Sequence, residues 1–217
     1  PGHRTPELAK FMQKDGEVLI NAWVKLLPDN TISVIVPHAE MGQGAHTALP
    51  MMLADEMDAD WSKVSMEQAP AHNEYANFHI ASDVVLPGIV PGYLNDTVDG
   101  VFLTVTQQLG LQITGGSYSV RATGVRGMRV AGAAARELLM NAAAKKWQVP
   151  VAEIRSENSY LYHDASNKSA PYIDFATEAA LHKGETFPTL KSPEQFKIMG
   201  QESIQRFDIP AKVDGTA

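Results

Sequence analysis

A short segment with two glycines, EMGQGAHT at residues 40–47, separates a strand pattern from a helix pattern. Residues 31–36 alternate polar with β-branched apolar side chains, which is typical of a β-strand. Leucine and methionine then recur at helical spacing in residues 49–57. Thr47 is expected to cap that helix, which places Pro50 in its first turn, where a backbone N–H has no partner to lose. The chain must therefore adopt a fold in which a loop leads directly from a strand into a helix.

The residue types in this loop favour ligand binding. Gly42 and Gly44 allow a ligand to approach the backbone, and the amide of Gln43 can both donate and accept hydrogen bonds. The helix N-terminus that follows offers free N–H donors and a partial positive charge. Taken alone, Gly-x-Gly is more often a tight turn than a cofactor loop. Thr47 stands where a dinucleotide-binding fingerprint needs its third glycine, which disfavours an NAD site.

Composition excludes several classes of function. The formal charge of −7 argues against a nucleic-acid partner, because phosphate binding requires a basic surface. No run of about 18 apolar residues is present, so no transmembrane segment is predicted in this sequence. The absence of cysteine excludes disulfides, thiolate metal ligands, iron–sulfur ligation and a cysteine nucleophile within these 217 residues.

The first half of the chain reads as an arm followed by a mixed segment of strands and helices. Residues 1–20 are expected to form an N-terminal arm with a short helix near residues 6–12. Residues 22–27 and 31–36 form a predicted hairpin around Pro-Asp-Asn, and a further strand follows Asp60. The connection of residues 69–95 contains several prolines and glycines, and a loop of this length is usually a lid or a partner contact.

The second half contains a second glycine loop and the strongest predicted helix. Residues 99–112 fit a helix or a strand, and we favour a helix. TGGSYS at residues 114–119 is a loop rich in glycine and hydroxyl groups, and residues 129–146 are an alanine-rich helix expected to pack very closely against another element. Another hairpin is predicted around residues 157–158, and a short helix at 173–181. We therefore expect an α+β fold with mixed sheets and packed helices, whose main domain covers residues 21–186.

Five sequence segments, in this order along the chain, resemble one protein family. They are NAWV with PDNT (residues 21–31), EMGQGAHTALPMMLADEMDADWSKV, TGGSYSVR, MRVAGAAARELLMNAAAKKW and RFDIPAKVDGTA. They are similar to the N-terminal part of the molybdopterin-binding large subunit of the xanthine dehydrogenase and aldehyde oxidase superfamily. The branch is that of the isoquinoline 1-oxidoreductase β subunit and of bacterial membrane-associated aldehyde dehydrogenases. The resemblance covers nearly the whole chain from Asn21 onward.

The resemblance implies a cofactor and a set of residues that hold it. Molybdenum would be held by the dithiolene of molybdopterin, in the form of a cytosine dinucleotide, and not by protein side chains. Gln43, between Gly42 and Gly44, would hydrogen-bond the apical oxo ligand of molybdenum. The second loop would hold the pterin or its pyrophosphate through Thr114, Gly115, Gly116, Ser117 and Ser119.

The resemblance also implies a reaction and partners. The reaction would hydroxylate an aldehyde or an N-heterocyclic aromatic carbon with oxygen from water, and electrons would pass to an iron–sulfur small subunit. Relatives often carry twin-arginine export signals, so the periplasm is expected, with the cytoplasm as the alternative.

One motif of the family is absent from this sequence. The general base of the family is a glutamate in a Gly-x-Gly-Glu setting, and neither Glu185 nor Glu202 has that setting. No catalytic residue is therefore assigned to this chain. We expect it to be the first segment of a large subunit, with residues 187–217 as an extended, uncapped linker toward a hammerhead-like domain. The alternative is a binding or assembly module that keeps the fold without metal.

Other polar residues allow weaker functional readings. His38 and His46 flank the first loop, but without a third ligand at suitable spacing a packing or solvated role is favoured over a metal site. His72 and His79 lie in the long connection and are expected to be exposed loop residues. Two readings stay open for Arg121, Arg126 and Arg129, which either contact a cofactor phosphate or pair with acidic side chains.

Overall fold

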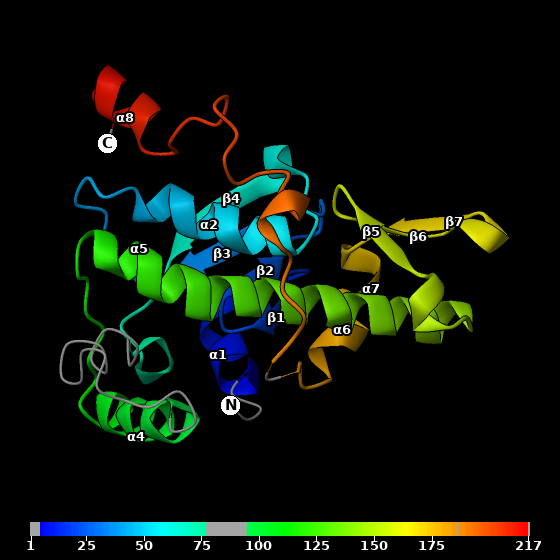
Figure 1. Cartoon of the computed structure of the whole chain (residues 1–217), viewed down its shortest axis with the longest axis horizontal. Helices are drawn as coiled ribbons and strands as arrows, with labels where there is room; N and C mark the ends of the chain where they lie inside the picture. Colours follow the sequence, from blue (N-terminus) through cyan, green and yellow to red (C-terminus); the bar gives the residue numbers. More distant parts are fainter. Residues whose placement is uncertain (1–4, 77–94, 186, 217) are drawn as a thin grey trace.

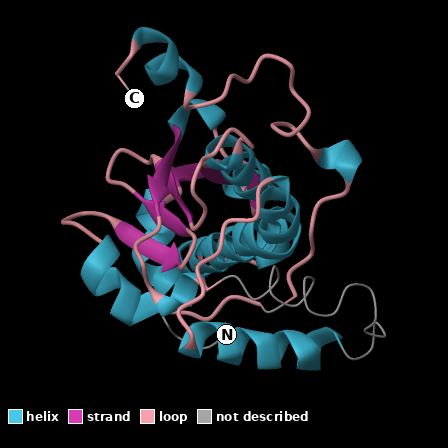
Figure 2. Cartoon of the chain, turned by 90° about the vertical axis from the view of Figure 1, so that its left-hand side faces the viewer, coloured by secondary structure: helices cyan, strands magenta, loops and turns pink. Residues whose placement is uncertain are grey.

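The computed structural model describes residues 5–76, 95–185 and 187–216, and it has an α+β architecture (Figure 1). A four-stranded sheet and a three-stranded sheet are packed with helices, which confirms the predicted fold class. The continuous helical run of residues 117–147 crosses the molecule (Figure 1). In the turned view of Figure 2 this run is seen nearly end-on beside the strands. Among the described residues, no helix is both long and apolar enough to cross a membrane.

The four-stranded sheet combines antiparallel and parallel pairing. Its strands lie in sequence order: β1 (Val18–Asn21), β2 (Val24–Leu26), β3 (Ile32–Val36) and β4 (Val64–Gln68). The predicted hairpin is confirmed as the antiparallel pair β2–β3. Strand β4 is parallel to β3, with Ile32 opposite Val64, and this pairing was not predicted. Parallel neighbours need a crossover connection, and the helix after the first glycine loop provides it.

Both faces of β3 are buried, so the sheet forms a central layer. Val34 and Val36 face the larger apolar cluster, whereas Ile35 points to the opposite face. There it packs with Leu8 of α1 (Thr5–Met12), the helix expected near residues 6–12. The sheet begins at Val18, inside the range assigned to the N-terminal arm, while the domain boundary near residue 20 stays a prediction.

The helix after the first glycine loop, α2 (Ala45–Glu56), begins earlier than predicted. Its N-cap is Gly44, in the left-handed conformation, so the prediction that Thr47 caps this helix was wrong. Pro50 consequently lies inside the helix and not in its first turn. The early start has a physical cause, because the carboxylate of Glu40 accepts the N–H groups of Gly42, Gly44 and His46 and so caps the helix from the preceding loop.

The predicted alanine-rich helix is confirmed and is longer than expected. Helix α5 (Ser117–Thr123), a π-helical segment (Gly124–Met128) and α6 (Arg129–Trp147) follow one another without interruption. A Cβ atom added at Gly132 would lie 2.4 Å from the carbonyl oxygen of Leu53 in α2. The backbones of α6 and α2 are therefore nearly in contact, as the small side chains predicted. Helix α4 (Asn95–Gln108) confirms the helical reading of that segment.

The remaining elements complete a second, smaller sheet. Strands β5 (Arg155–Glu157) and β6 (Tyr160–His163) form the predicted hairpin, and β7 (Lys168–Pro171) pairs with β6. Helix α7 (Ile173–Ala180) follows as predicted and packs against α6. Short 3-10 turns join these elements: η1 (Trp61–Lys63), η2 (Asn73–Tyr75), η5 (Val151–Glu153), η6 (Asp164–Ser166) and η7 (Pro193–Gln195).

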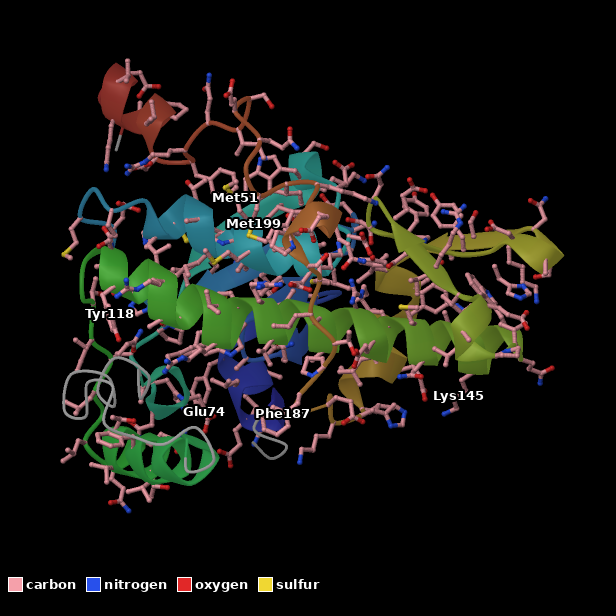
Figure 3. The ribbon with its side chains drawn as sticks, in the orientation of Figure 1. Met51, Glu74, Tyr118, Lys145, Phe187 and Met199 are labelled. Carbon is pink, nitrogen blue, oxygen red and sulfur yellow. The ribbon has the colours of Figure 1, made fainter. Side chains whose placement is uncertain are left out.

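The C-terminal segment is folded against α2. The carboxylate of Asp55 accepts the N–H groups of Lys197, Ile198 and Met199, and Met199 is seen where the segment passes α2 (Figure 3). The chain ends in α8 (Ile209–Asp214), which Gly215 caps in the left-handed conformation, so the expectation of an uncapped end was wrong. The role of residues 187–217 as a linker stays a prediction. The part of the long connection at 77–94, including His79, lies outside the described residues.

Candidate functional site

The two glycine loops lie side by side although about 70 residues separate them. The N–H of Ala39 donates to Oγ1 of Thr114 at 3.0 Å, and Nε2 of Gln112 donates to the carbonyl oxygen of Pro37 at 3.3 Å. Helices α2 and α5 both start at this end of the molecule and contact each other. Tyr118, at the start of α5, marks the position in Figure 3. The fold therefore combines two loops and two helix N-termini at one place.

A buried histidine connects the two loops. His38 is fully buried, with Nδ1 3.1 Å from the carbonyl oxygen of Ile113 and Nε2 2.8 Å from Oγ1 of Thr123. Burial lowers the pKa of His38 to about 4, so the ring is neutral at pH 7. Since a carbonyl oxygen only accepts, Nδ1 carries the proton and Nε2 accepts from the Thr123 hydroxyl. The prediction of a packing role is confirmed for His38.

The other histidine of the loop also has protein partners. Nε2 of His46 lies 2.9 Å from the carbonyl oxygen of His38 and 3.1 Å from Oε1 of Gln68. Within residues 5–76, 95–185 and 187–216, no group of three or more His, Asp or Glu side chains is arranged to hold a metal ion.

Glu40 accepts backbone N–H groups that we had expected to be free to bind a ligand. Its Oε1 accepts from the N–H groups of Gly42 at 2.8 Å and Gly44 at 2.9 Å, and its Oε2 accepts from His46 at 3.1 Å. Burial by itself would raise the pKa of Glu40, but these N–H groups and the charge of Arg206 hold it below its usual value. The expectation of free N–H donors at this helix start was therefore wrong for these three groups. No role was predicted for Glu40, because it lies four residues before the N-cap Gly44 and reaches these N–H groups only through the turn of the loop.

Gln43 is held within its own loop. Its Nε2 donates to the carbonyl oxygen of Ala39 at 2.7 Å, and its Oε1 accepts the N–H of Met41 at 2.6 Å. Gly42 has positive φ, and apart from its chain neighbours no atom of the described residues lies within 4 Å of the position that a Cβ would occupy. The backbone of the loop is therefore open to an approaching group at Gly42, next to the Gln43 amide.

The second loop ends at Gly116, because Ser117 and Ser119 already belong to α5, so the prediction of a loop over residues 114–119 was wrong for its second half. The predicted residues of this loop have two different roles. Oγ of Ser119 is buried and accepts the N–H of Gly115 at 2.6 Å, while Thr114 bonds the first loop, so both hydroxyls shape the site. Gly116 has positive φ and open space around its Cβ position. Ser117 is exposed, and its hydroxyl has no hydrogen-bond partner in the part of the chain that the structure describes. Gly116 and Ser117 are therefore the members of this loop available to a ligand.

Arg206, which sequence analysis did not identify, reaches the first loop from the C-terminal segment. Its Nη1 donates to the carbonyl oxygen of Gly42 at 3.0 Å, and its Nη2 lies 3.2 Å from Oε1 of Glu40. Asp208 holds the same guanidinium through two hydrogen bonds. The RFDIPAKV motif contained this residue, but nothing in the local pattern indicated which part of the molecule it would contact.

The three arginines near the second loop differ in their surroundings. Arg129 pairs with the buried carboxylate of Glu56 at 2.6 Å, which decides its role in favour of an acidic partner. The guanidinium of Arg121 lies over the Tyr118 ring at 5.0 Å. Arg126 is exposed on the π-helical segment. For Arg121 and Arg126, contact with a cofactor phosphate and pairing with acidic side chains both stay open.

A hollow at the opposite end of α2 does not belong to this site. It is lined by Asp58, Asp60, Trp61 and Lys197, among others. Asp58 is already bonded to Lys191 and Ser156. The hollow therefore lies among side chains that fasten the C-terminal segment.

Comparison with known proteins agrees with the resemblance drawn from the five motifs. A family model described as "Molybdopterin cofactor-binding domain" matches residues 7–83, a range that contains the first glycine loop and not the second. The isoquinoline 1-oxidoreductase subunit beta of Brevundimonas diminuta is 29% identical over 232 residues, covering 91% of this chain and 26% of that protein.

A second relative carries a different cofactor in its name. The membrane-bound aldehyde dehydrogenase [pyrroloquinoline-quinone] of Gluconacetobacter polyoxogenes is 27% identical over 217 residues, covering 97% of this chain and 23% of that protein. The chain thus spans about a quarter of the length of both curated relatives.

Proposed function

We propose that this chain, which is similar to a molybdopterin cofactor-binding domain and to the isoquinoline 1-oxidoreductase subunit beta, forms part of the cofactor site of a molybdenum-dependent hydroxylase. The substrate class is an aldehyde or an N-heterocyclic aromatic compound. The single observation that carries the proposal is the pairing of the two glycine loops by the Ala39–Thr114 hydrogen bond. This hydrogen bond supports the proposal because it brings the glycine-rich backbone of both loops together at the starts of α2 and α5.

The residues present fit a molybdopterin group. Gly42 and Gly116 leave open space beside the backbone, and Ser117 offers a hydroxyl without a partner among the described residues. The first loop would lie toward the metal, with Gln43 presenting its amide, and the second loop toward the pterin or its pyrophosphate, in the cytosine dinucleotide form. To do so, the amide of Gln43 must exchange its bond to the Ala39 carbonyl for one to the cofactor. When bound, the cofactor would supply two-electron oxidation of the substrate carbon.

The general base and the electron acceptor would come from outside this chain. These 217 residues contain no Gly-x-Gly-Glu motif and no cysteine, so they supply neither the base of this family nor an iron–sulfur cluster. We propose that the base lies in another part of the longer protein and that an iron–sulfur subunit takes the electrons. We also propose a periplasmic location, which fractionation of cells expressing the whole protein would test: recovery of the protein with cytoplasmic markers would contradict it.

The test is the cofactor content and turnover of the whole assembly. We expect about one molybdenum and one pterin per copy of this chain, and Gln43→Ala to lower turnover more than about tenfold, as loss of a preorganised donor does. Gln108→Ala is the matched control, because Gln108 is exposed on α4 and lies outside both loops. Wild-type turnover in Gln43→Ala with the cofactor bound would contradict the role of Gln43.

A second candidate is a binding or assembly module without metal. The observation that favours it is that Glu40 occupies three N–H groups of the first loop and Gln43 bonds its own backbone, so that the loop is satisfied without a ligand. An assembly free of molybdenum and pterin would favour this module. Pyrroloquinoline quinone should be measured in the same sample, because the name of one relative assigns that group to it.

A further inference from the structure

We infer that Arg206 is a positioning residue for the first glycine loop, and that docking of residues 197–208 along α2 sets the shape of that loop. The inference rests on the proposed function only in the claim that this loop faces the cofactor. Neither Arg206 nor the segment around it belongs to the two loops that the motifs assigned to the cofactor.

The guanidinium of Arg206 bridges the loop and its own segment. One side donates to the Gly42 carbonyl at 3.0 Å and approaches Glu40 at 3.2 Å. The other side is held by Asp208, whose carboxylate accepts from Nε at 2.9 Å and from Nη2 at 2.6 Å. A planar guanidinium presents several donors in a fixed fork, so it can hold the Gly42 carbonyl and two carboxylates in one defined geometry.

Glu40 makes the contact with Arg206 important for the loop. The Glu40 side chain is only 7% exposed, and its carboxylate organises the N–H groups of Gly42, Gly44 and His46. Arg206 is the cation paired with this buried carboxylate. Without it, the carboxylate of Glu40 would keep only its N–H partners, and a largely buried carboxylate that has lost its cation favours rearrangement toward water.

The segment that carries Arg206 is fastened to α2 at both ends. At one end Asp55 accepts three consecutive N–H groups of the segment, and at the other the N–H of Phe207 donates to Oγ1 of Thr47 at 2.8 Å. The ring of Phe207 also stacks on Trp61, with centroids 5.0 Å apart and planes inclined by 8°. Arg206 is thus delivered to the loop by a packed segment and not by a free tail.

Hydrogen exchange of the whole assembly, followed by mass spectrometry of peptides covering residues 38–50, tests this inference. Arg206→Ala should speed exchange in these peptides by at least about tenfold, because the loop loses its counter-charge. Arg206→Lys should restore part of the protection. Glu40→Gln serves as a second variant if Arg206→Ala does not fold, and it should also speed exchange. The double variant should speed exchange by less than the product of the two single effects, because the two changes share the Arg206–Glu40 contact.

Arg155→Ala is the matched control, since Arg155 also pairs with two carboxylates but lies on β5, away from the loops. It should leave the exchange of residues 38–50 unchanged. Exchange in Arg206→Ala equal to that of the wild type would overturn the inference. The molybdenum content of the wild-type assembly tests the proposed function independently of the positioning role of Arg206. Fast exchange in Arg206→Ala, together with a wild-type assembly that lacks molybdenum, would support the positioning role and reject the proposed function.

Discussion

His38 and Thr123 form a buried hydrogen bond of 2.8 Å that ties the start of the first glycine loop to the helix following the second. The same ring donates to the Ile113 carbonyl, one residue before the second loop. The relative position of the two loops therefore depends on a neutral imidazole with one protonated nitrogen and one acceptor nitrogen. Protonation would place a second donor against a hydroxyl and a positive charge in the interior.

The first prediction concerns the pH dependence of stability. The pKa of His38 falls from 6.5 to about 4 on folding, so between these values the unfolded chain binds a proton that the folded chain does not. The contribution of His38 to the free energy of unfolding has its full value above pH 6.5. It decreases as the pH falls toward 4, by about 3 kcal/mol in total. The free energy of unfolding, measured with denaturant between pH 4 and 7, should rise less steeply with pH in His38→Asn than in the wild type. His182→Gln, at an exposed site, is the control, and parallel pH profiles of His38→Asn and the wild type would refute the prediction.

The second prediction concerns the contact between α2 and α6. Gly132→Ala would place a methyl group 2.4 Å from the Leu53 carbonyl oxygen and 3.0 Å from Cβ of Glu56. We expect a loss of about 1–3 kcal/mol or more in the free energy of unfolding, because backbone atoms must move apart. Gly100→Ala in α4, where a Cβ would have no described atom within 4 Å, should be neutral or stabilising by about 0.5–1 kcal/mol. Equal stability changes in the two variants would show that the helices are not in close contact.

The third prediction concerns the buried ion pair beneath the C-terminal segment. Glu56 is fully buried, and Arg129 is its cation at 2.6 Å. Arg129→Met should cost about 3–5 kcal/mol in unfolding free energy, because it leaves a buried charge without its partner. Lys145→Met removes the cation of an exposed pair with Glu178 and should cost at most about 1 kcal/mol. Comparable losses from both substitutions, measured by urea unfolding, would contradict the difference that burial predicts.

The fourth prediction separates structural from binding hydroxyls in the second loop. Ser119→Ala removes a buried acceptor from the Gly115 N–H and should lower stability by about 1–3 kcal/mol. Ser117→Ala changes an exposed hydroxyl and should leave stability unchanged within about 0.5 kcal/mol. If the proposed function holds, Ser117→Ala should instead lower the pterin content of the purified assembly. Loss of stability in Ser117→Ala would assign its hydroxyl a structural role.

Local sequence patterns determined most of the elements of this protein. Period-two alternation identified the β2–β3 hairpin, helical spacing identified α2, and the run of alanines identified α6 and its close packing. These signals are readable because they depend on side chains within a few positions of one another. The two glycine loops were recognised for the same reason, and their residue types, together with the order of the five motifs, led to the family.

Tertiary structure decided how the loops are held. The parallel pairing of β3 with β4, the ion pair of Glu56 with Arg129, and the reach of Arg206 to Glu40 across 166 residues leave no trace in local periodicity. Such contacts form between residues distant in sequence, where partner choice depends on packing and burial in the completed fold.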